Sequence, residues 1–179
     1  MLAPKQKILR AKLPSYAAFL KPIVVRHHME SLVADLEPAL VEAFRAAGWT
    51  SGRSVAIDSE GLDHYAAHPL ALQLLAEVGG LRVGRAGPGS ECVASDLKFA
   101  TRMRRDRAEF LTRAFPEIGD VVPIGDACND HIMLFVDARG RFLAFTDPDG
   151  KLYAAGSSFE ELARRLLWGY KWDFPVSGA

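Results

Sequence analysis

A cysteine and a histidine three positions apart are the residues best suited to catalysis in this sequence. Cys128 and His131 stand in the segment Cys-Asn-Asp-His, just ahead of an apolar run. A thiol beside an imidazole could form the thiolate–imidazolium pair of a cysteine hydrolase. In such enzymes, however, the histidine is distant in sequence, and nothing beside Cys128 resembles a nucleophile motif. We therefore expect a half-buried cysteine and a loop histidine.

Histidines with the spacing of a zinc site occur once. His64 and His68 are four residues apart, which places two imidazoles on one face of a helix. Pro69 predicts that the helix begins at about His68, so the pair straddles its start. A second candidate set has no paired spacing behind it: Cys92, Cys128 and His131. We expect neither a metal nor a cofactor.

Loops that could hold a calcium ion or a phosphate are incomplete. Asp147-Pro-Asp-Gly150 is similar to the start of a calcium loop, but Ser158 stands where a bidentate glutamate is needed. A Pro-Asp-Gly hairpin turn explains this segment better. Gly84, Gly87 and Gly89 lack the dinucleotide-binding spacing, and Pro88 removes an N–H that a phosphate would need.

A run of basic residues lies in the segment 101–115, where five arginines could contact nucleic-acid phosphates: Arg102, Arg104, Arg105, Arg107 and Arg113. Asp106 and Glu109 interrupt the run, and no aromatic side chain alternates with it for base stacking. The pattern favours a helix with one solvated face and local ion pairs. We expect no nucleic-acid partner.

Helical periodicity and glycine stops predict the positions of the helices. Apolar residues spaced by three and four from Leu32 to Phe44 indicate an amphipathic helix that ends at Gly48. Residues 70–78, after a Pro69 suited to the first turn, are apolar nearly all round, which indicates a buried helix that Gly79-Gly80 ends. The last helix begins after Ser157 or Ser158, with Glu160 and Glu161 in its first turn.

Short strands separated by turns fill the rest of the chain. We expect strands over 54–58, 81–84, 92–99, 121–124, 132–136, 142–146 and 152–154, with turns that include Gly125-Asp126. Connections this short require antiparallel neighbours, because a parallel pair needs a long crossover. The sequence therefore predicts an α+β fold with a mainly antiparallel sheet.

Composition and charge indicate a globular domain with an unusual N-terminal segment. Of 179 residues, 49% are hydrophobic and 25% charged, and no apolar run is long enough to cross a bilayer. Residues 1–29 carry six basic and no acidic side chains, and the remainder carries 16 basic and 22 acidic ones. We expect a basic extension over 1–29, flexible or absent from the native chain, one domain over 30–172, and a tail over 173–179.

Several motifs occur in an order that resembles the SUKH superfamily, and within it the third family of immunity proteins. The matching segments are 46–53, 74–81, 87–89, 122–125, 137–140 and 156–169. The resemblance covers residues 32–170. It departs from the family pattern at Val78, where an aromatic is common, and the segment 101–115 has no clear counterpart. The residues that carry it are architectural: Trp49, Gly79, Gly80, Leu81, Gly125 and Gly156.

The resemblance implies a bacterial immunity protein that binds and neutralises a cognate polymorphic toxin, often a nuclease or deaminase. Because two cysteines make no disulfide framework and no segment resembles a secretory leader, we expect the protein in a reducing cytoplasm. An acidic domain would be attracted to a toxin that carries cations for phosphate. We expect the interface at the acidic turns: Asp126, Asp130, Asp147 and Asp149, with Glu91 and Asp96 as weaker candidates. Two alternatives stay open: a regulatory or scaffold protein of the same superfamily, and a small cysteine-dependent enzyme. Neither a membrane partner nor a particular oligomeric state is predicted.

Overall fold

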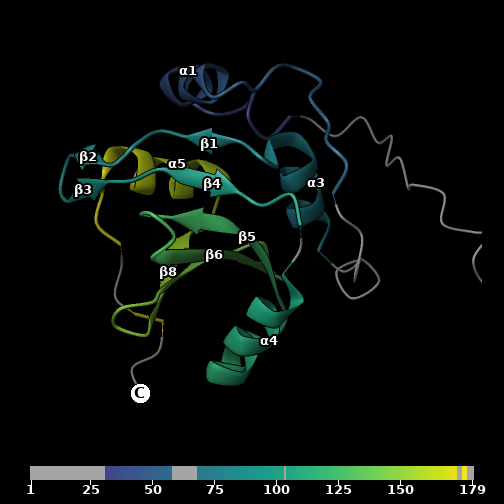
Figure 1. The fold of residues 1–179 in the computed structure, drawn as a ribbon, viewed down its shortest axis with the longest axis vertical. Helices are drawn as coiled ribbons and strands as arrows, with labels where there is room; N and C mark the ends of the chain where they lie inside the picture. The colour runs from purple at the N-terminus through teal and green to yellow at the C-terminus, as the bar shows by residue number, and fades with distance from the viewer. Residues whose placement is uncertain (1–30, 58–67, 103, 173–174, 177–179) are drawn as a thin grey trace, which may run out of the picture.

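An antiparallel sheet forms the centre of the protein (Figure 1). The structure is a computed structural model that describes residues 31–57, 68–102, 104–172 and 175–176. Within these ranges six strands pair in the order β1-β4-β5-β6-β7-β8, all antiparallel. Their bounds are β1 Arg82–Val83, β4 Leu97–Phe99, β5 Val121–Ala127, β6 Ile132–Asp137, β7 Phe142–Thr146 and β8 Lys151–Gly156. The predicted α+β class with a mainly antiparallel sheet is confirmed.

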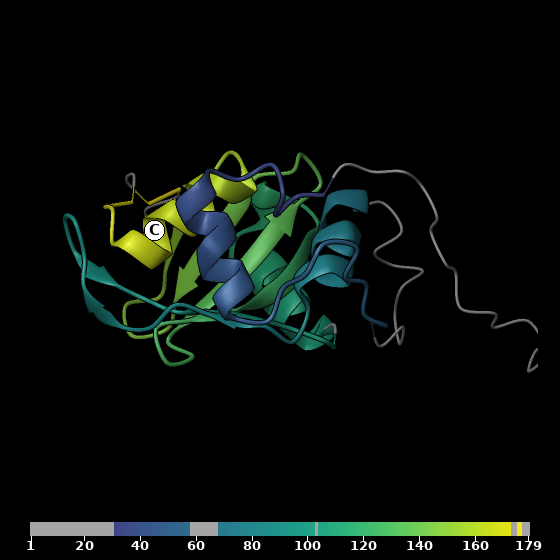
Figure 2. The same ribbon diagram turned by 90° about the horizontal axis from the view of Figure 1, so that it is seen from above.

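Helices cover both faces of this sheet. Their bounds are α1 Pro38–Ala46, α3 Pro69–Val78, α4 Arg105–Ala114 and α5 Phe159–Trp168, with a 3-10 turn at Pro116–Ile118. Figure 2 shows α1 and α5 side by side on one face. Phe159 of α5 lies within 5.5–6.1 Å, between ring centroids, of three core aromatics: Phe44, Phe99 and Phe142. The edge-to-face packing of Phe159 on Phe44 and Phe99 adds to the apolar burial that fixes these helices.

The opposite face, which we call the outer face, carries α4. Directly paired residues in antiparallel strands share a face, so Arg82, Lys98, Asp126 and Met133 form one row across β1, β4, β5 and β6. The row continues to Phe145, whose ring meets Phe110 of α4 at 5.4 Å and Phe115 at 6.1 Å between centroids. The outer face is therefore apolar under α4 and charged beside it.

Two hairpin turns lie together at one end of the sheet. Cys128, Asn129 and Asp130 all have left-handed φ, at 53°, 55° and 67°, and they lie in the turn that connects β5 to β6. Pro148-Asp149-Gly150 connects β7 to β8, with Gly150 at φ 64°, which confirms the predicted turn. Asp147 N–H donates to the His131 carbonyl at 3.0 Å, so the two turns are neighbours.

The first helix begins later than its periodicity predicts. Residues 32–35 form turns, and α1 starts at Pro38. Proline disfavours the helical conformation in the residue before it, and Glu37 is extended at φ −54° and ψ 147°. Pro38 itself fits the first helical turn, where its missing N–H costs nothing. Leu32 to Leu36 thus have helical spacing without belonging to the helix.

Two further predictions of local structure are wrong. Residues 54–57 form no strand; Val55 N–H donates to the Ala76 carbonyl, a single bond to the buried helix. Gly125-Asp126 is not a turn, because β5 continues through both residues to Ala127. The register shifts between Pro123 and Gly125, so a β-bulge replaces the predicted turn. A Cβ on Gly125 would lie 2.1 Å from the Lys98 carbonyl oxygen, which explains the glycine.

The start of α5 follows the sequence prediction. Ser158 is the N-cap, and its hydroxyl accepts from the Glu161 amide at 3.1 Å. The Glu161 carboxylate accepts from the Ser157 amide at 2.8 Å and from the Ser157 hydroxyl at 2.9 Å. Chiefly the amide bond from Ser157 lowers the pKa of Glu161 below its ordinary 4.5. The reciprocal bonds satisfy N–H groups that a helix start leaves open.

Glu161→Gln should therefore lower the free energy of unfolding by about 0.5–1 kcal/mol at pH 7, the size of an N-cap contribution reduced by solvent screening. The folded-state pKa is depressed, so this stability is present above the unfolded pKa and is lost as pH falls below about 4.5. Urea denaturation at pH 7 and pH 3 measures both values. Glu117→Gln controls for loss of an exposed carboxylate. A variant penalty that is equal at both pH values would contradict the assignment.

Candidate partner-binding surface

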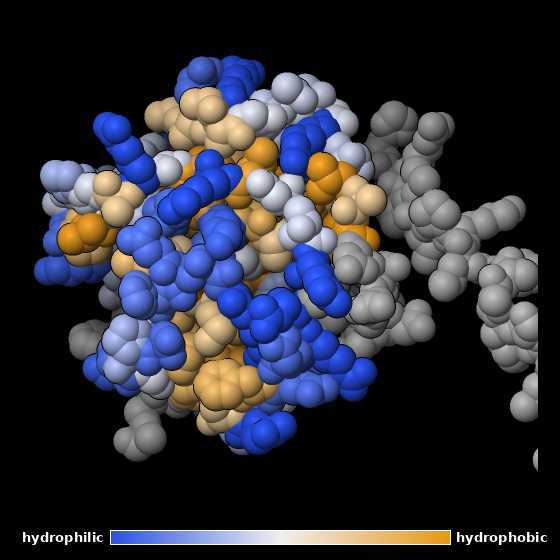
Figure 3. All heavy atoms as spheres, viewed as in Figure 1, coloured by the Kyte–Doolittle hydropathy of each residue, from blue (hydrophilic) through white to orange (hydrophobic). Residues whose placement is uncertain are grey.

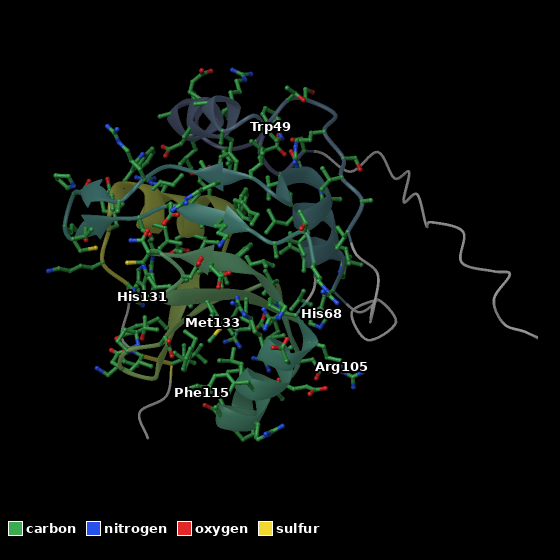
Figure 4. All side chains as sticks on the ribbon, viewed as in Figure 1. Trp49, His68, Arg105, Phe115, His131 and Met133 are labelled. Atoms are coloured by element: carbon green, nitrogen blue, oxygen red, sulfur yellow. The ribbon has the colours of Figure 1, made fainter. Side chains whose placement is uncertain are left out.

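Three of the acidic residues predicted to bind a partner lie at the turn end of the sheet. Asp130 belongs to the β5–β6 turn, and Asp147 and Asp149 belong to the β7–β8 turn beside it. All three are exposed. The structure thus brings these three carboxylates to one end of the molecule, near His131 in Figure 4.

Two of these three carboxylates already have cationic neighbours. Asp130 accepts from the Lys98 ammonium at 3.0 Å, and this bond lowers the pKa of Asp130. Asp149 accepts from the Thr146 hydroxyl, which is the main cause of its lowered pKa, and lies 3.3 Å from the Lys151 ammonium. Asp147 has no ion-pair partner within the described part of the chain. Surface pairs of this kind contribute little stability, so a partner could exchange them at low cost.

The remaining predicted interface residues lie elsewhere. Asp126 sits within β5 on the outer face and pairs with Arg107 of α4; the two side chains are only 14% and 25% exposed. Asp96 does not fit its predicted place at an interface. Its side chain is 4% exposed and bonded to Arg82 at 2.7 Å, so it offers no carboxylate to a partner. Between β3 and β4 this aspartate instead orients Arg82. Buried carboxylates are held in this way because an unpaired one would be costly.

Charges of both signs therefore alternate over the outer face. Figure 3 shows hydrophilic side chains running across the middle of the molecule toward α4. The ion pairs that carry this pattern are Arg82–Asp96, Lys98–Asp130 and Arg107–Asp126. The excess of acids counted in the sequence is thus largely matched locally on this face. Among the predicted interface residues, Asp147 and Glu91 have no ion-pair partner in the part of the chain that the structure describes.

The Cys128–His131 segment is a hairpin turn. The His131 amide donates to the Cys128 carbonyl at 3.2 Å, and the Cys128 amide donates to the Ser95 hydroxyl at 2.7 Å. Cys128 is partly buried and His131 is exposed, the arrangement that the sequence suggests. Neither residue lines the hollow beside α4 or the hollow beside α5. The backbone bonds account for their proximity.

Metal-binding groups do not converge where the structure describes them. Within residues 31–57, 68–102, 104–172 and 175–176, no three His, Cys, Asp or Glu side chains form a cluster that could hold a metal ion. His68 is buried at the start of α3, and His64 lies outside the described residues, as do residues 1–29.

Two of the matching segments, 46–53 and 74–81, meet around Glu77 of α3, which the sequence did not single out. Trp49 is 3% exposed and its indole N–H donates to Glu77 Oε1 at 3.1 Å. The Arg53 guanidinium donates to the carbonyls of Glu77 at 2.6 Å and Gly79 at 2.7 Å. Gly80 then turns the chain at φ 79° into β1. The sequence did hold a signal for this network: a glutamate in an otherwise apolar, buried helix needs hydrogen-bond partners.

The Gly-Pro-Gly segment forms a hairpin that caps α5. Strands β2 (Gly87–Pro88) and β3 (Val93–Ala94) pair, and the turn between them meets the end of the helix. The Ser90 amide donates to the Trp168 carbonyl at 2.7 Å, and the amides of Glu91 and Cys92 donate to the Gly169 carbonyl at 2.8 and 2.9 Å. The last carbonyls of a helix have no donor within the helix, and the amides of this hairpin donate to them. Glu91, the last predicted interface residue, is exposed here and accepts from the Lys171 amide at 2.9 Å.

An antiparallel sheet with helices on both faces and a charged outer face defines an α+β domain. Residues 36–169 match the profile of the SUKH-3 immunity protein family, so the chain belongs to that family. The predicted resemblance is thereby confirmed. Families of immunity proteins are generally non-enzymatic and imply a toxin as partner.

Two other comparisons gave no relatives. No curated protein and no solved structure matches the chain. Among the described residues, no helix has the length and apolarity needed to span a bilayer.

Proposed function

We propose that this protein binds a toxin that attacks nucleic acid and neutralises it by direct contact. Membership of the SUKH-3 immunity protein family carries this proposal. The exposed carboxylates at the turn end of the sheet support the choice of toxin, since an enzyme that holds phosphate must carry cations. Unmatched charge at Asp147 and Glu91 would speed the encounter by long-range attraction.

Neutralisation can be tested in cells and with purified proteins. A candidate toxin gene is first sought beside this gene in the source genome, and it is then expressed with and without the immunity gene in a host that lacks both. We expect growth to be restored only when both are expressed, and the two purified proteins to form a stable complex in size-exclusion chromatography. A toxin that remains lethal and does not bind would refute the proposal.

The acidic turns give a second expected result. Replacing Asp126, Asp130, Asp147 and Asp149 together by asparagine should slow association with the toxin by about tenfold at low salt, because charge complementarity acts mainly on the association rate. The difference should shrink at high salt, where screening removes long-range attraction. Stopped-flow or surface plasmon resonance measures the rates.

A matched control removes the same four charges elsewhere. Asp35, Glu42, Glu109 and Glu117 are exposed and lie away from the turn end, and amide variants of all four should leave association unchanged within about twofold. Asp126 is partly buried beside Arg107, so Asp130, Asp147 and Asp149 are also changed without it. Full toxin protection and an unchanged association rate in both acidic-turn variants would show that the interface lies elsewhere.

A further inference from the structure

An arginine lies beside two aromatic rings at the end of α5. The Arg164 guanidinium lies 5.4 Å from the Trp168 ring centroid and 5.6 Å from that of Tyr170. Its side chain is 44% exposed. We call Arg164, Trp168 and Tyr170 the arginine–aromatic cluster. Trp, Tyr and Arg are the residue types that most often dominate binding energy at protein interfaces.

The guanidinium in this cluster lacks strong partners. Within the described part of the chain it makes no hydrogen bond, and its nearest acid is Glu37, with 3.7 Å between Arg164 Nε and Glu37 Oε1. That oxygen of Glu37 is itself buried without a hydrogen bond. The two rings stand at 73° to each other with 6.5 Å between their centroids, and the guanidinium lies within cation–π distance of both. These contacts restrict the guanidinium before a partner arrives, so less side-chain entropy is lost on binding.

The surrounding charges favour an anionic ligand. A shallow hollow of about 580 Å³ is lined by Arg164, Arg165, Tyr170, Lys171, Ser158, Glu160 and Glu161. Its acids are already engaged: Glu161 accepts from Arg165 at 2.6 Å and from Ser157, and Glu160 accepts from the Glu37 amide at 3.3 Å. Lys171 is exposed and has no ion pair for its ammonium among the described residues. One cation of the hollow thus lacks a carboxylate partner, and a second, Arg164, has only the long ion pair with Glu37 at 3.7 Å.

The neighbouring hairpin extends the same surface with an apolar residue. Val93 on β3 is 69% exposed, the most exposed large apolar side chain among the described residues. The residues on either side of it contact Gly169, directly after Trp168. An apolar contact beside a partly desolvated charge resembles the centre of a binding site surrounded by a polar rim.

From these contacts we infer that the arginine–aromatic cluster receives an aspartate or glutamate side chain from the partner protein, bound through both carboxylate oxygens by Arg164. A bidentate arginine–carboxylate pair is short, directional and stronger than a bond to a neutral acceptor. This inference rests on the proposed function for the identity of the partner as a toxin. It assigns the toxin two contacts of opposite sign: cations over the acidic turns and a carboxylate at α5.

Binding of a carboxylate can be tested without the toxin. The full chain is titrated with an acetylated, amidated tetra-aspartate peptide while the Trp168 indole and Arg164 Nε signals are followed by NMR. We expect both signals to shift with tetra-aspartate and neither to shift with tetra-asparagine. Arg164→Ala should abolish the Trp168 shift, whereas Arg45→Ala, an exposed arginine of α1, should preserve it. Equal shifts with both peptides, or a tighter response to a single-stranded RNA octamer, would overturn the inference.

The second measurement uses the adjacent toxin. Arg164→Ala should weaken its binding by at least about 30-fold, the loss expected for a hot spot. Arg164→Lys, which keeps the charge without the planar fork, should weaken it by about tenfold. Arg45→Ala should stay within about twofold. Lys171→Glu reverses a charge outside the helix and should also weaken binding, which keeps the test valid if Arg164→Ala misfolds.

The two proposals fail in different ways. If the unmodified protein does not bind the toxin, the proposed function is refuted, and the peptide titration still decides the carboxylate site. If the unmodified protein binds and Arg164→Ala binds within about threefold of it, the inference is refuted and the function stands.

Discussion

Glu77→Ala is expected to lower the free energy of unfolding by about 3–5 kcal/mol, because it removes the acceptor for several buried donors. Glu77 is 8% exposed. Its carboxylate accepts from the amides of Leu32 at 2.9 Å and Val33 at 3.2 Å, from the Trp49 indole at 3.1 Å, and from the Ser31 hydroxyl. Alanine leaves these donors without partners and leaves a cavity beside them. Urea denaturation followed by circular dichroism measures the loss.

A double-mutant cycle separates the indole bond from the rest of the network. Trp49→Phe alone should cost about 1–2 kcal/mol, since it removes one donor to a charged acceptor and little volume. In the Glu77→Ala background the same change should cost clearly less, because the acceptor is already gone. Glu42→Ala, an exposed glutamate on α1, should change stability by under about 0.5 kcal/mol. A loss under 1 kcal/mol for Glu77→Ala would contradict this role.

The parts of the fold that were predicted correctly depend on local chemistry. Pro69 and Gly79-Gly80 define α3, and Ser158 with Glu161 defines the start of α5, because caps and stops act over one turn of helix. Short connections between apolar segments were enough to predict antiparallel pairing.

The parts that were missed depend on contacts between distant segments. Leu32 and Val33 have helical spacing, yet Glu77, over forty residues away, binds their amides and holds them in a turn. Gly125-Asp126 is a typical turn sequence, but the closeness of Gly125 to the Lys98 carbonyl keeps it within β5. Nothing near either segment in sequence specifies such a partner.

The charge of the outer face likewise depends on contacts between distant segments. The acids around Asp126, Asp130 and Asp96 suggest a negatively charged surface when they are counted along the chain. In the folded protein Arg107, Lys98 and Arg82 reach them from other elements. A surface potential depends on these neighbours in space, so composition alone overestimates the acidity of the outer face. The arginine–aromatic cluster was missed for a related reason. In the sequence Arg164 is indistinguishable from an ordinary exposed helix residue, and only the fold shows its aromatic neighbours.

Gly169→Ala should be the most damaging glycine substitution at the end of α5, with an expected loss of about 3 kcal/mol in the free energy of unfolding. Gly169 has φ 66°, a left-handed conformation that costs a non-glycine residue about 1 kcal/mol. A Cβ there would also lie 2.3 Å from the Cys92 carbonyl oxygen and 2.9 Å from the Gly89 Cα. Both contacts are with backbone, so the hairpin must move away from the helix to relieve them.

A substitution at a second glycine separates the cost of this displacement from the cost of the backbone conformation. Gly150 has nearly the same backbone conformation, at φ 64°, but no atom lies within 4 Å of a Cβ placed on it. Gly150→Ala should therefore cost only the conformational term of about 1 kcal/mol. Hydrogen exchange should show faster exchange at the Ser90 and Cys92 amides in Gly169→Ala alone, because their acceptors at the helix end move out of reach. Equal stability losses in the two variants, with both amides still protected, would mean that the hairpin is not held by its close contact with α5.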